Sequence, residues 1–138
     1  MFWLVVKPLS VGVRILLIHD DQVLMVKHVY EKYWYLPGGA VERGESLEDA
    51  ARREATEEVG ATINELSLFG VYTNLEEGKS DHVVVFLSSD FELNGQSDDE
   101  IECVTFHPLE DLPEPISPGS DNRIREFIDG KSGIYGSW

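Results

Sequence analysis

Three glutamates lie close together in one predicted helix: Glu54, Glu57 and Glu58. No glycine or proline interrupts residues 47–59, which favours a helix there. On a wheel of about 100° per residue, Glu54 and Glu58 fall in the apolar sector, among alanines. Like charges at this spacing destabilise a helix, and partial burial raises the cost unless a cation is shared. Because hard oxygen ligands suit Mg²⁺ or Mn²⁺, the pattern favours a divalent metal site.

The same wheel assigns the other faces of this helix. The side chains expected to face the core are Leu47, Ala51, Ala55 and Val59. The side chains expected to face solvent are Asp49, Arg52, Arg53 and Thr56. Most runs of glutamate are solvated helix surface, and this interpretation stays open beside metal binding.

A longer pattern surrounds the helix. It reads Gly39, five residues, Glu45, seven residues, Arg53-Glu54, apolar Ala55, one residue, Glu57-Glu58, one residue, Gly60 and apolar Ala61. The pattern resembles the Nudix box of the Nudix hydrolases, with every defining position filled. At typical residue usage, seven fixed identities match by chance at on the order of 10⁻⁸ per start point.

The resemblance implies an enzyme that uses water to cut a phosphoanhydride bond in a nucleoside diphosphate linked to another group. It implies that Glu54, Glu57 and Glu58 hold Mg²⁺ or Mn²⁺, with help from the backbone carbonyl of Gly39. Such ions lower the pKa of bound water, neutralise phosphate oxygens and stabilise the leaving phosphate.

Other box positions would support this loop–helix–loop. The resemblance implies that Arg53 pairs with Glu45 and steadies the loop against the helix. Gly38 and Gly39 are expected to allow a tight bend close to the metal. Ser46, three residues before Asp49, is expected to be the helix N-cap, and Gly60 the left-handed residue after the helix.

The general base has several candidates. Family members use either the box glutamate, here Glu54, or an acidic residue from a later loop. That loop offers Asp99, Glu100 and Glu102. Glu102, just before a predicted strand, matches best in position, and Glu100 comes next. The alternative is that these loop carboxylates are ordinary solvated surface charges.

Substrate contacts are expected on both sides of this box. Arg14 and Lys27 are cations on predicted strands, and one of them is expected to meet substrate phosphate, with a plain surface role as the alternative. Four aromatic residues cluster just before the box: Tyr30, Tyr33, Trp34 and Tyr35. Some are expected in the core, and one of them, with Trp34 as the named candidate, could stack on a base. Glu100 is a further candidate contact. The strand histidines His28, His82 and His107 are expected to be packed or at the surface.

The substrate itself is less constrained. ADP-ribose hydrolases of this family carry a proline beyond the box, where this chain has Leu75-Glu76-Glu77, and the dinucleoside polyphosphate type does not fit Gly78 and Lys79. The substrate classes that remain are nucleotide sugars, (d)NTPs and related small nucleotides, with a nucleotide sugar preferred. An RNA 5′-end pyrophosphohydrolase is disfavoured, because the net charge is −15 and no basic run offsets it. A non-catalytic sensor with this fold is disfavoured because all box glutamates are present.

The elements around the box predict a layered domain. Strands are expected at residues 11–18, 23–29, 34–36, 63–72, 82–91 and 101–106, with His19-Asp20-Asp21-Gln22 as a turn. A second helix is expected at residues 121–129. These elements predict a single α/β domain over residues 1–138. The family resemblance implies the Nudix fold, a mixed β-sheet between α-helices.

Composition indicates the compartment and the partners. Cys103 is the single cysteine, so no internal disulfide can form, and a cytoplasmic protein is expected. The apolar run Phe2–Val6 is too short to span a membrane. The expected partner is a small nucleotide, with no nucleic acid and no membrane, and a homodimer is left open.

Overall fold

The computed structural model describes residues 9–75 and 80–138. Phe2–Val6 lies outside the described residues, and so do residues 76–79, which belong to the segment that was compared with the ADP-ribose and dinucleoside polyphosphate types. The described elements are, in chain order, β1 (Leu9–His19), β2 (Gln22–His28), β3 (Trp34–Tyr35), β4 (Gly38–Ala40), α1 (Leu47–Val59), β5 (Ala61–Asn74), β6 (Ser80–Leu93), β7 (Ile101–Pro108), α2 (Pro118–Ile128) and β8 (Ile134–Ser137).

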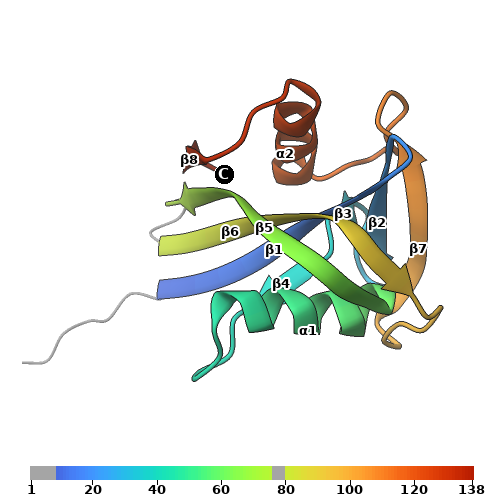
Figure 1. The fold of residues 1–138 in the computed structure, drawn as a ribbon, viewed down its shortest axis with the longest axis horizontal. Helices are drawn as coiled ribbons and strands as arrows, with labels where there is room; N and C mark the ends of the chain where they lie inside the picture. Colours follow the sequence, from blue (N-terminus) through green and yellow to red (C-terminus); the bar gives the residue numbers. More distant parts are fainter. Residues whose placement is uncertain (1–8, 76–79) are drawn as a thin grey trace, which may run out of the picture.

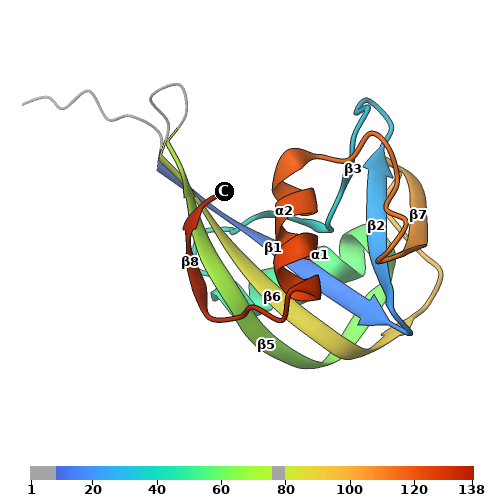
Figure 2. The same cartoon turned by 90° about the horizontal axis from the view of Figure 1, so that it is seen from above.

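The strands form one mixed sheet in the order β3-β2-β1-β6-β5-β8, and β4 and β7 pair with β1 and β2. The pairs β1–β6 and β5–β8 are parallel, whereas the other pairs are antiparallel. Helices α1 and α2 lie on opposite faces of the sheet in both views (Figures 1 and 2). The predicted mixed α/β sandwich is therefore confirmed.

A tight turn joins β1 to β2. Asp20 and Asp21 have φ angles of 50° and 60°. Two successive residues with positive φ are typical of a hairpin whose turn matches the strand twist, and aspartate tolerates this conformation. The predicted turn is confirmed, and it directs β2 back toward the end of α1.

Two hydrophobic clusters hold the layers together, one on each side of the sheet. The cluster beneath α1 contains Ala50, Ala51, Ala55 and Val59, packed on residues of β1, β2, β5 and β6. The cluster beneath α2 contains Ile124, packed on Phe69, Tyr72 and residues of β1 and β2. Small alanines allow α1 to approach the sheet closely, which brings its carboxylates next to β4.

Helix α1 has the predicted ends. The Ser46 hydroxyl accepts a hydrogen bond from the Asp49 amide at 3.0 Å. Gly60 follows the helix with φ 67°, and its N–H donates to the carbonyls of Ala55 and Thr56. Both ends are thus satisfied by local hydrogen bonds, and the helix is fixed in position against the loop that precedes it.

The wheel was wrong for three side chains of α1. Leu47 is 40% exposed, because it belongs to the first turn, beyond the part of the helix that the sheet covers. Arg52 and Arg53 are half-buried, not solvated. Each guanidinium folds back to bond groups outside the helix, Ile63 O for Arg52 and Glu45 for Arg53. A wheel describes only the helix and cannot anticipate such partners.

Three further elements differ from the sequence prediction. Gly38–Ala40, expected as a bend, is strand β4, because its backbone pairs with Gly12, Val13 and Arg14 of β1. The short strand β8 was not predicted. Helix α2 begins earlier than expected, since Ser117 caps it and Pro118 fits the first helical position. Among the described residues, no helix is both long and apolar enough to cross a membrane.

Candidate active site

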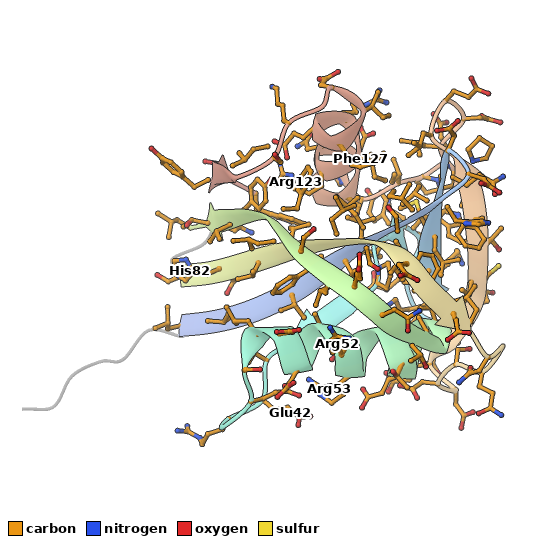
Figure 3. The ribbon with its side chains drawn as sticks, in the orientation of Figure 1. Glu42, Arg52, Arg53, His82, Arg123 and Phe127 are labelled. Carbon is orange, nitrogen blue, oxygen red and sulfur yellow. The ribbon has the colours of Figure 1, made fainter. Side chains whose placement is uncertain are left out.

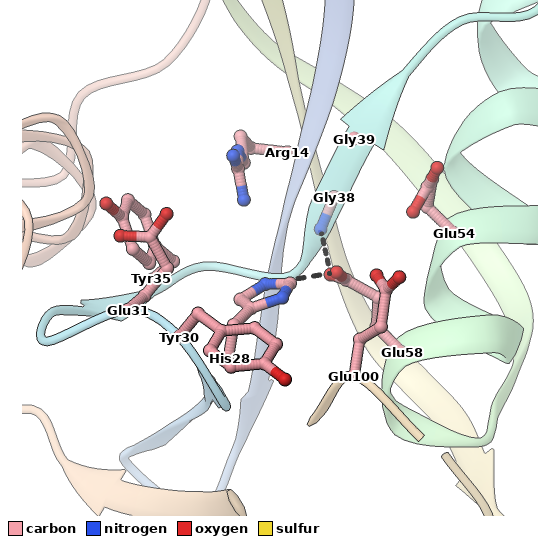
Figure 4. Close-up of a pocket in the computed structure, with 10 residues that line it drawn as sticks. All are labelled: Arg14, His28, Tyr30, Glu31, Tyr35, Gly38, Gly39, Glu54, Glu58 and Glu100. Atoms are coloured by element: carbon pink, nitrogen blue, oxygen red, sulfur yellow. Dashed lines mark hydrogen bonds and ion pairs between the residues drawn. The ribbon is translucent and has the colours of Figure 1, made fainter. Parts of the chain in front are cut away.

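A cleft of about 580 Å³ lies between the end of β2, strand β4 and helix α1 (Figure 4). Its lining brings together several residues singled out in the sequence and several that were not: Arg14, His28, Tyr30, Glu31, Tyr35, Gly38, Gly39, Glu54, Glu58 and Glu100. The exposed side chain of Glu57 does not line it. The cleft therefore combines carboxylates from α1 with a cation from β1.

Arg53 binds the box loop to the helix. Its guanidinium donates to both oxygens of Glu45, at 2.7 and 3.0 Å, so the expected ion pair is present. It also donates to Glu54 at 2.9 Å, to Glu57 at 3.2 Å and to the Ala40 carbonyl at 3.0 Å. Figure 3 shows Arg53 beneath α1, beside the loop that carries Glu42. These bonds lower the pKa of Glu45 and raise that of Arg53.

Glu58 is the most buried of the box carboxylates, with 7% of its surface exposed. Its Oε1 accepts a hydrogen bond from the Gly38 N–H at 2.8 Å, and its Oε2 lies 3.3 Å from His28 Nε2. Burial raises the pKa of Glu58 to about 7, although the Gly38 N–H and nearby Arg14 favour the charged form. The site thus holds a carboxyl group whose charged form water solvates poorly.

Glu54 stands beside the backbone of Gly39. A side-chain Cβ at Gly39 would lie 2.6 Å from Glu54 Oε1, so any side chain there would displace the Glu54 carboxylate. Burial also raises the pKa of Glu54, and the charge of Glu57 adds to the shift. Desolvated carboxylates beside the Gly39 backbone fit a hard divalent cation.

The three box glutamates nevertheless do not converge on one point. Within residues 9–75 and 80–138, no three His, Cys, Asp or Glu side chains form a completed metal cluster. Arg53 draws Glu54 and Glu57 to itself, whereas Glu58 accepts a hydrogen bond from Gly38 and lies 3.3 Å from His28. The wheel predicted one cluster because it considers only the helix itself and takes no account of Arg53.

Arg14 is the cation of the cleft. Its Nη1 donates to the Leu36 carbonyl at 2.7 Å, and its guanidinium carbon lies 5.5 Å from the ring centroid of Tyr35. Burial lowers the pKa of Arg14, and the charges of Glu58 and Glu54 oppose that shift. A guanidinium remains charged in proteins, so Arg14 presents a positive group beside the carboxylates.

Lys27, Glu102 and Trp34, three residues expected at the site, do not line the cleft. Lys27 forms an ion pair with Glu102. Trp34 packs on His107, with ring centroids 4.7 Å apart, and joins the cluster beneath α2. Strand alternation explains Lys27 and Trp34, whose neighbours His28 and Tyr35 line the cleft, and the bulge at Glu102 explains why this residue points elsewhere. The structure therefore favours Glu100 over Glu102, the reverse of the sequence ranking.

Two residues that line the cleft, His28 and Glu31, were not predicted as site residues, and two more, Tyr30 and Tyr35, were named only as members of the aromatic cluster before the box. His28, Tyr30, Glu31 and Tyr35 come from the end of β2 and the segment leading to β3. His28 was expected to be packed or at the surface, yet it contacts Glu58. The only available signal was the cluster of aromatic residues before the box, which did not indicate which ring faces the cleft.

A family model, the NUDIX domain, matches residues 8–127. The chain belongs to the Nudix hydrolase family. The resemblance first seen in residues 39–61 thus extends over most of the chain, and it identifies this protein as a Nudix pyrophosphohydrolase.

Nudix relatives of known sequence and structure agree with this assignment. The uncharacterized Nudix hydrolase YvcI of Bacillus subtilis is 29% identical over 86% of this chain and 79% of its own length. An ADP-ribose pyrophosphatase of Methanocaldococcus jannaschii is 29% identical over 83% of this chain and 70% of its own. The MutT NUDIX hydrolase of Burkholderia pseudomallei superposes with a TM-score of 0.77, at 25% identity, over 86% of this chain and 98% of that one. The Nudix fold is confirmed, and Nudix hydrolases generally use divalent metal ions.

Proposed function

We propose that this Nudix hydrolase cuts the phosphoanhydride bond of a nucleoside diphosphate linked to another group, with a nucleotide sugar as the preferred substrate and a (d)NTP as the alternative. One observation carries the proposal: Glu54, Glu58 and the cation Arg14 line the same cleft. A diphosphate is an anion that needs both a positive side chain and bound cations in a protein of net charge −15. The relative from Methanocaldococcus jannaschii, an ADP-ribose pyrophosphatase, supports a substrate of this class.

Glu54, Glu57, Glu58 and the Gly39 carbonyl are the groups that would hold Mg²⁺ or Mn²⁺. The bound metal would supply an activated water and neutralise phosphate oxygens. Arg53 and Glu45 keep the loop in place, and Arg14 binds a phosphate oxygen. The attacking water forms a bond to one phosphorus, the bridging P–O bond breaks, and a carboxylate takes the water's proton. The single cysteine supports a cytoplasmic location for this reaction.

Glu100 is our candidate for the carboxylate that takes this proton. Glu100→Gln is expected to lower kcat by roughly 10²-fold, the scale of a lost general base, and to leave the melting temperature nearly unchanged. Glu102→Gln is the matched control: it neutralises a carboxylate two residues away, outside the cleft, and should stay within about twofold of the wild-type rate, as expected of a residue with no part in the chemistry. If Glu100→Gln keeps the wild-type rate, Glu54 becomes the candidate base.

Metal removal tests the mechanism as a whole. A panel of nucleotide sugars, ADP-ribose and (d)NTPs is assayed with Mg²⁺ and with Mn²⁺ by phosphate release after phosphatase coupling. Exhaustive EDTA treatment is expected to lower hydrolysis of the best substrate at least about 100-fold, since the metal supplies several kcal/mol of transition-state stabilisation. Readdition of Mg²⁺ should restore the rate. Undiminished hydrolysis in EDTA would rule out the proposed mechanism.

A further inference from the structure

Glu58 is held at both oxygens by groups that lie outside its own helix. Gly38 of β4 donates its N–H to Oε1, and His28 at the end of β2 places Nε2 by Oε2 (Figure 4). We infer that His28 is a positioning residue: its Nε2–H fixes the Glu58 carboxylate in the orientation that the metal needs. The inference rests on the proposed metal-dependent function.

An irregularity in the sheet aims His28 into the cleft. Lys27 pairs with Cys103 of β7, but His28 pairs with Ile101, so Glu102 is an extra residue in the ladder. Such bulges redirect side chains and are frequent next to active sites. Here the bulge separates two neighbours: Lys27 turns to Glu102, and His28 turns to Glu58.

Nearby groups keep the imidazole in this position. The ring of His28 meets that of Tyr35 edge-on, with centroids 6.3 Å apart and an angle of 81°. The next residue, Val29, donates its N–H to the Glu100 carbonyl at 2.9 Å. The ring therefore has little freedom to leave Glu58, which is what pre-organisation of a ligand requires.

The box carboxylates have different partners. Glu54 and Glu57 accept hydrogen bonds from Arg53, a permanent cation. Glu58 accepts a hydrogen bond from the Gly38 N–H and lies 3.3 Å from His28 Nε2. His28→Lys would place a permanent cation against Glu58, as Arg53 does for Glu54 and Glu57, and would compete with a metal for its charge.

Three substitutions at one position separate hydrogen bonding from charge. His28→Gln supplies an uncharged donor, His28→Leu supplies no donor, and His28→Lys supplies a permanent cation. Binding of Mn²⁺ alone is measured by calorimetry on the substrate-free protein, and kcat and KM are then measured at saturating Mn²⁺. His28→Leu and His28→Lys are expected to raise the Kd for Mn²⁺ about 10-fold or more, the usual effect of removing a ligand's support, and His28→Gln less than about threefold.

His107→Leu is the matched control, because His107 is a β7 histidine whose Nε2 has no hydrogen-bond partner among the described residues. It should leave Mn²⁺ affinity unchanged. Mn²⁺ binding by His28→Leu equal to wild type would overturn the inference. So would a raised KM with unchanged Mn²⁺ affinity, which would make His28 a substrate contact.

Two further outcomes keep the test decisive. If His28→Leu does not fold, His28→Phe, which keeps a ring without a donor, takes its place, and wild-type Mn²⁺ affinity in that variant overturns the inference. If the wild-type protein itself binds no Mn²⁺, the proposed function fails before the role of His28 arises. The two failures are therefore distinguishable.

Discussion

Glu58→Gln is expected to lower kcat about 10³-fold and, in EDTA, to make the protein more stable than wild type. The loss of rate follows from removing a charged metal ligand at the centre of the site, which is worth about 4 kcal/mol of transition-state stabilisation. The gain in stability follows from burial. Only 7% of Glu58 is exposed, and glutamine keeps an oxygen that accepts the Gly38 N–H without carrying a charge.

The gain in stability of metal-free Glu58→Gln over wild type should increase with pH. Burial raises the pKa of Glu58 from 4.5 to about 7 in the folded protein. Between these values the folded state binds the proton and the unfolded state does not, so the free energy of unfolding of metal-free wild type falls as pH rises, by ~3 kcal/mol in total. Glu58→Gln has no titrating carboxyl at this position, so its free energy of unfolding should not fall in this way. The difference in stability between the variant and wild type should be largest near pH 8 and small near pH 5.

Thermal melts of both proteins at pH 5 and pH 8, in EDTA and in millimolar Mg²⁺, measure this effect. At pH 8 in EDTA, the variant should melt roughly 5 °C or more above wild type. Mg²⁺ should stabilise wild type by mass action and the variant much less. Glu57→Gln, a substitution at an exposed position of the same helix, should change the melting temperature in EDTA by little. A Glu58→Gln protein less stable than wild type would show that the hydrogen bonds of the carboxylate outweigh its desolvation.

Gly38→Ala is expected to cost about 3–5 kcal/mol of folding stability, from overpacking and backbone strain together. A Cβ at this position would lie 2.0 Å from the Val13 carbonyl oxygen and 2.9 Å from the Cα of Arg14. Both are backbone atoms of β1, the central strand, which cannot move without breaking its pairing with β4. Because the Gly38 N–H also holds Glu58, hydrolysis should fall with stability.

Two other glycines serve as controls in urea unfolding. Gly44 has φ 81°, and a Cβ added there would have no neighbour within 4 Å, so Gly44→Ala should cost only about 1 kcal/mol, for the backbone conformation. Gly136 also has open space, and Gly136→Ala should lie within about 0.5 kcal/mol of wild type. Equal effects at Gly38 and Gly44 would contradict the close approach of β4 to β1.

The box helix was predictable because its signals are local. Ser46, the uninterrupted run after it and Gly60 define both ends of α1 within a short stretch of sequence, and the structure has those ends. Strand β4 was not predictable in this way. Its two glycines are typical of a turn, and only the backbone of β1, far away in sequence, makes them a strand.

The same distinction applies to the candidate site. The spacing of Glu54, Glu57 and Glu58 is a property of one helix, so their place on that helix followed from the sequence, whereas the different partners of their side chains did not. Which loop carboxylate enters the cleft depends on how β7 pairs with β2, and a bulge in that ladder decides it. Sequence position therefore favoured Glu102, whereas the tertiary structure favours Glu100.

The parallel pairing of β1 with β6 has a consequence for how the chain is made. Leu9 pairs with Ser80, so the central strand waits for a partner synthesised about 70 residues later, which takes seconds at about 5–20 residues per second. The box helix leaves the ribosome during this interval, before the sheet that buries Glu58 is complete. Pairings between distant segments also slow folding. We expect that a nascent chain ending before β6 binds divalent ions weakly, and that tight binding begins only when β6 has emerged.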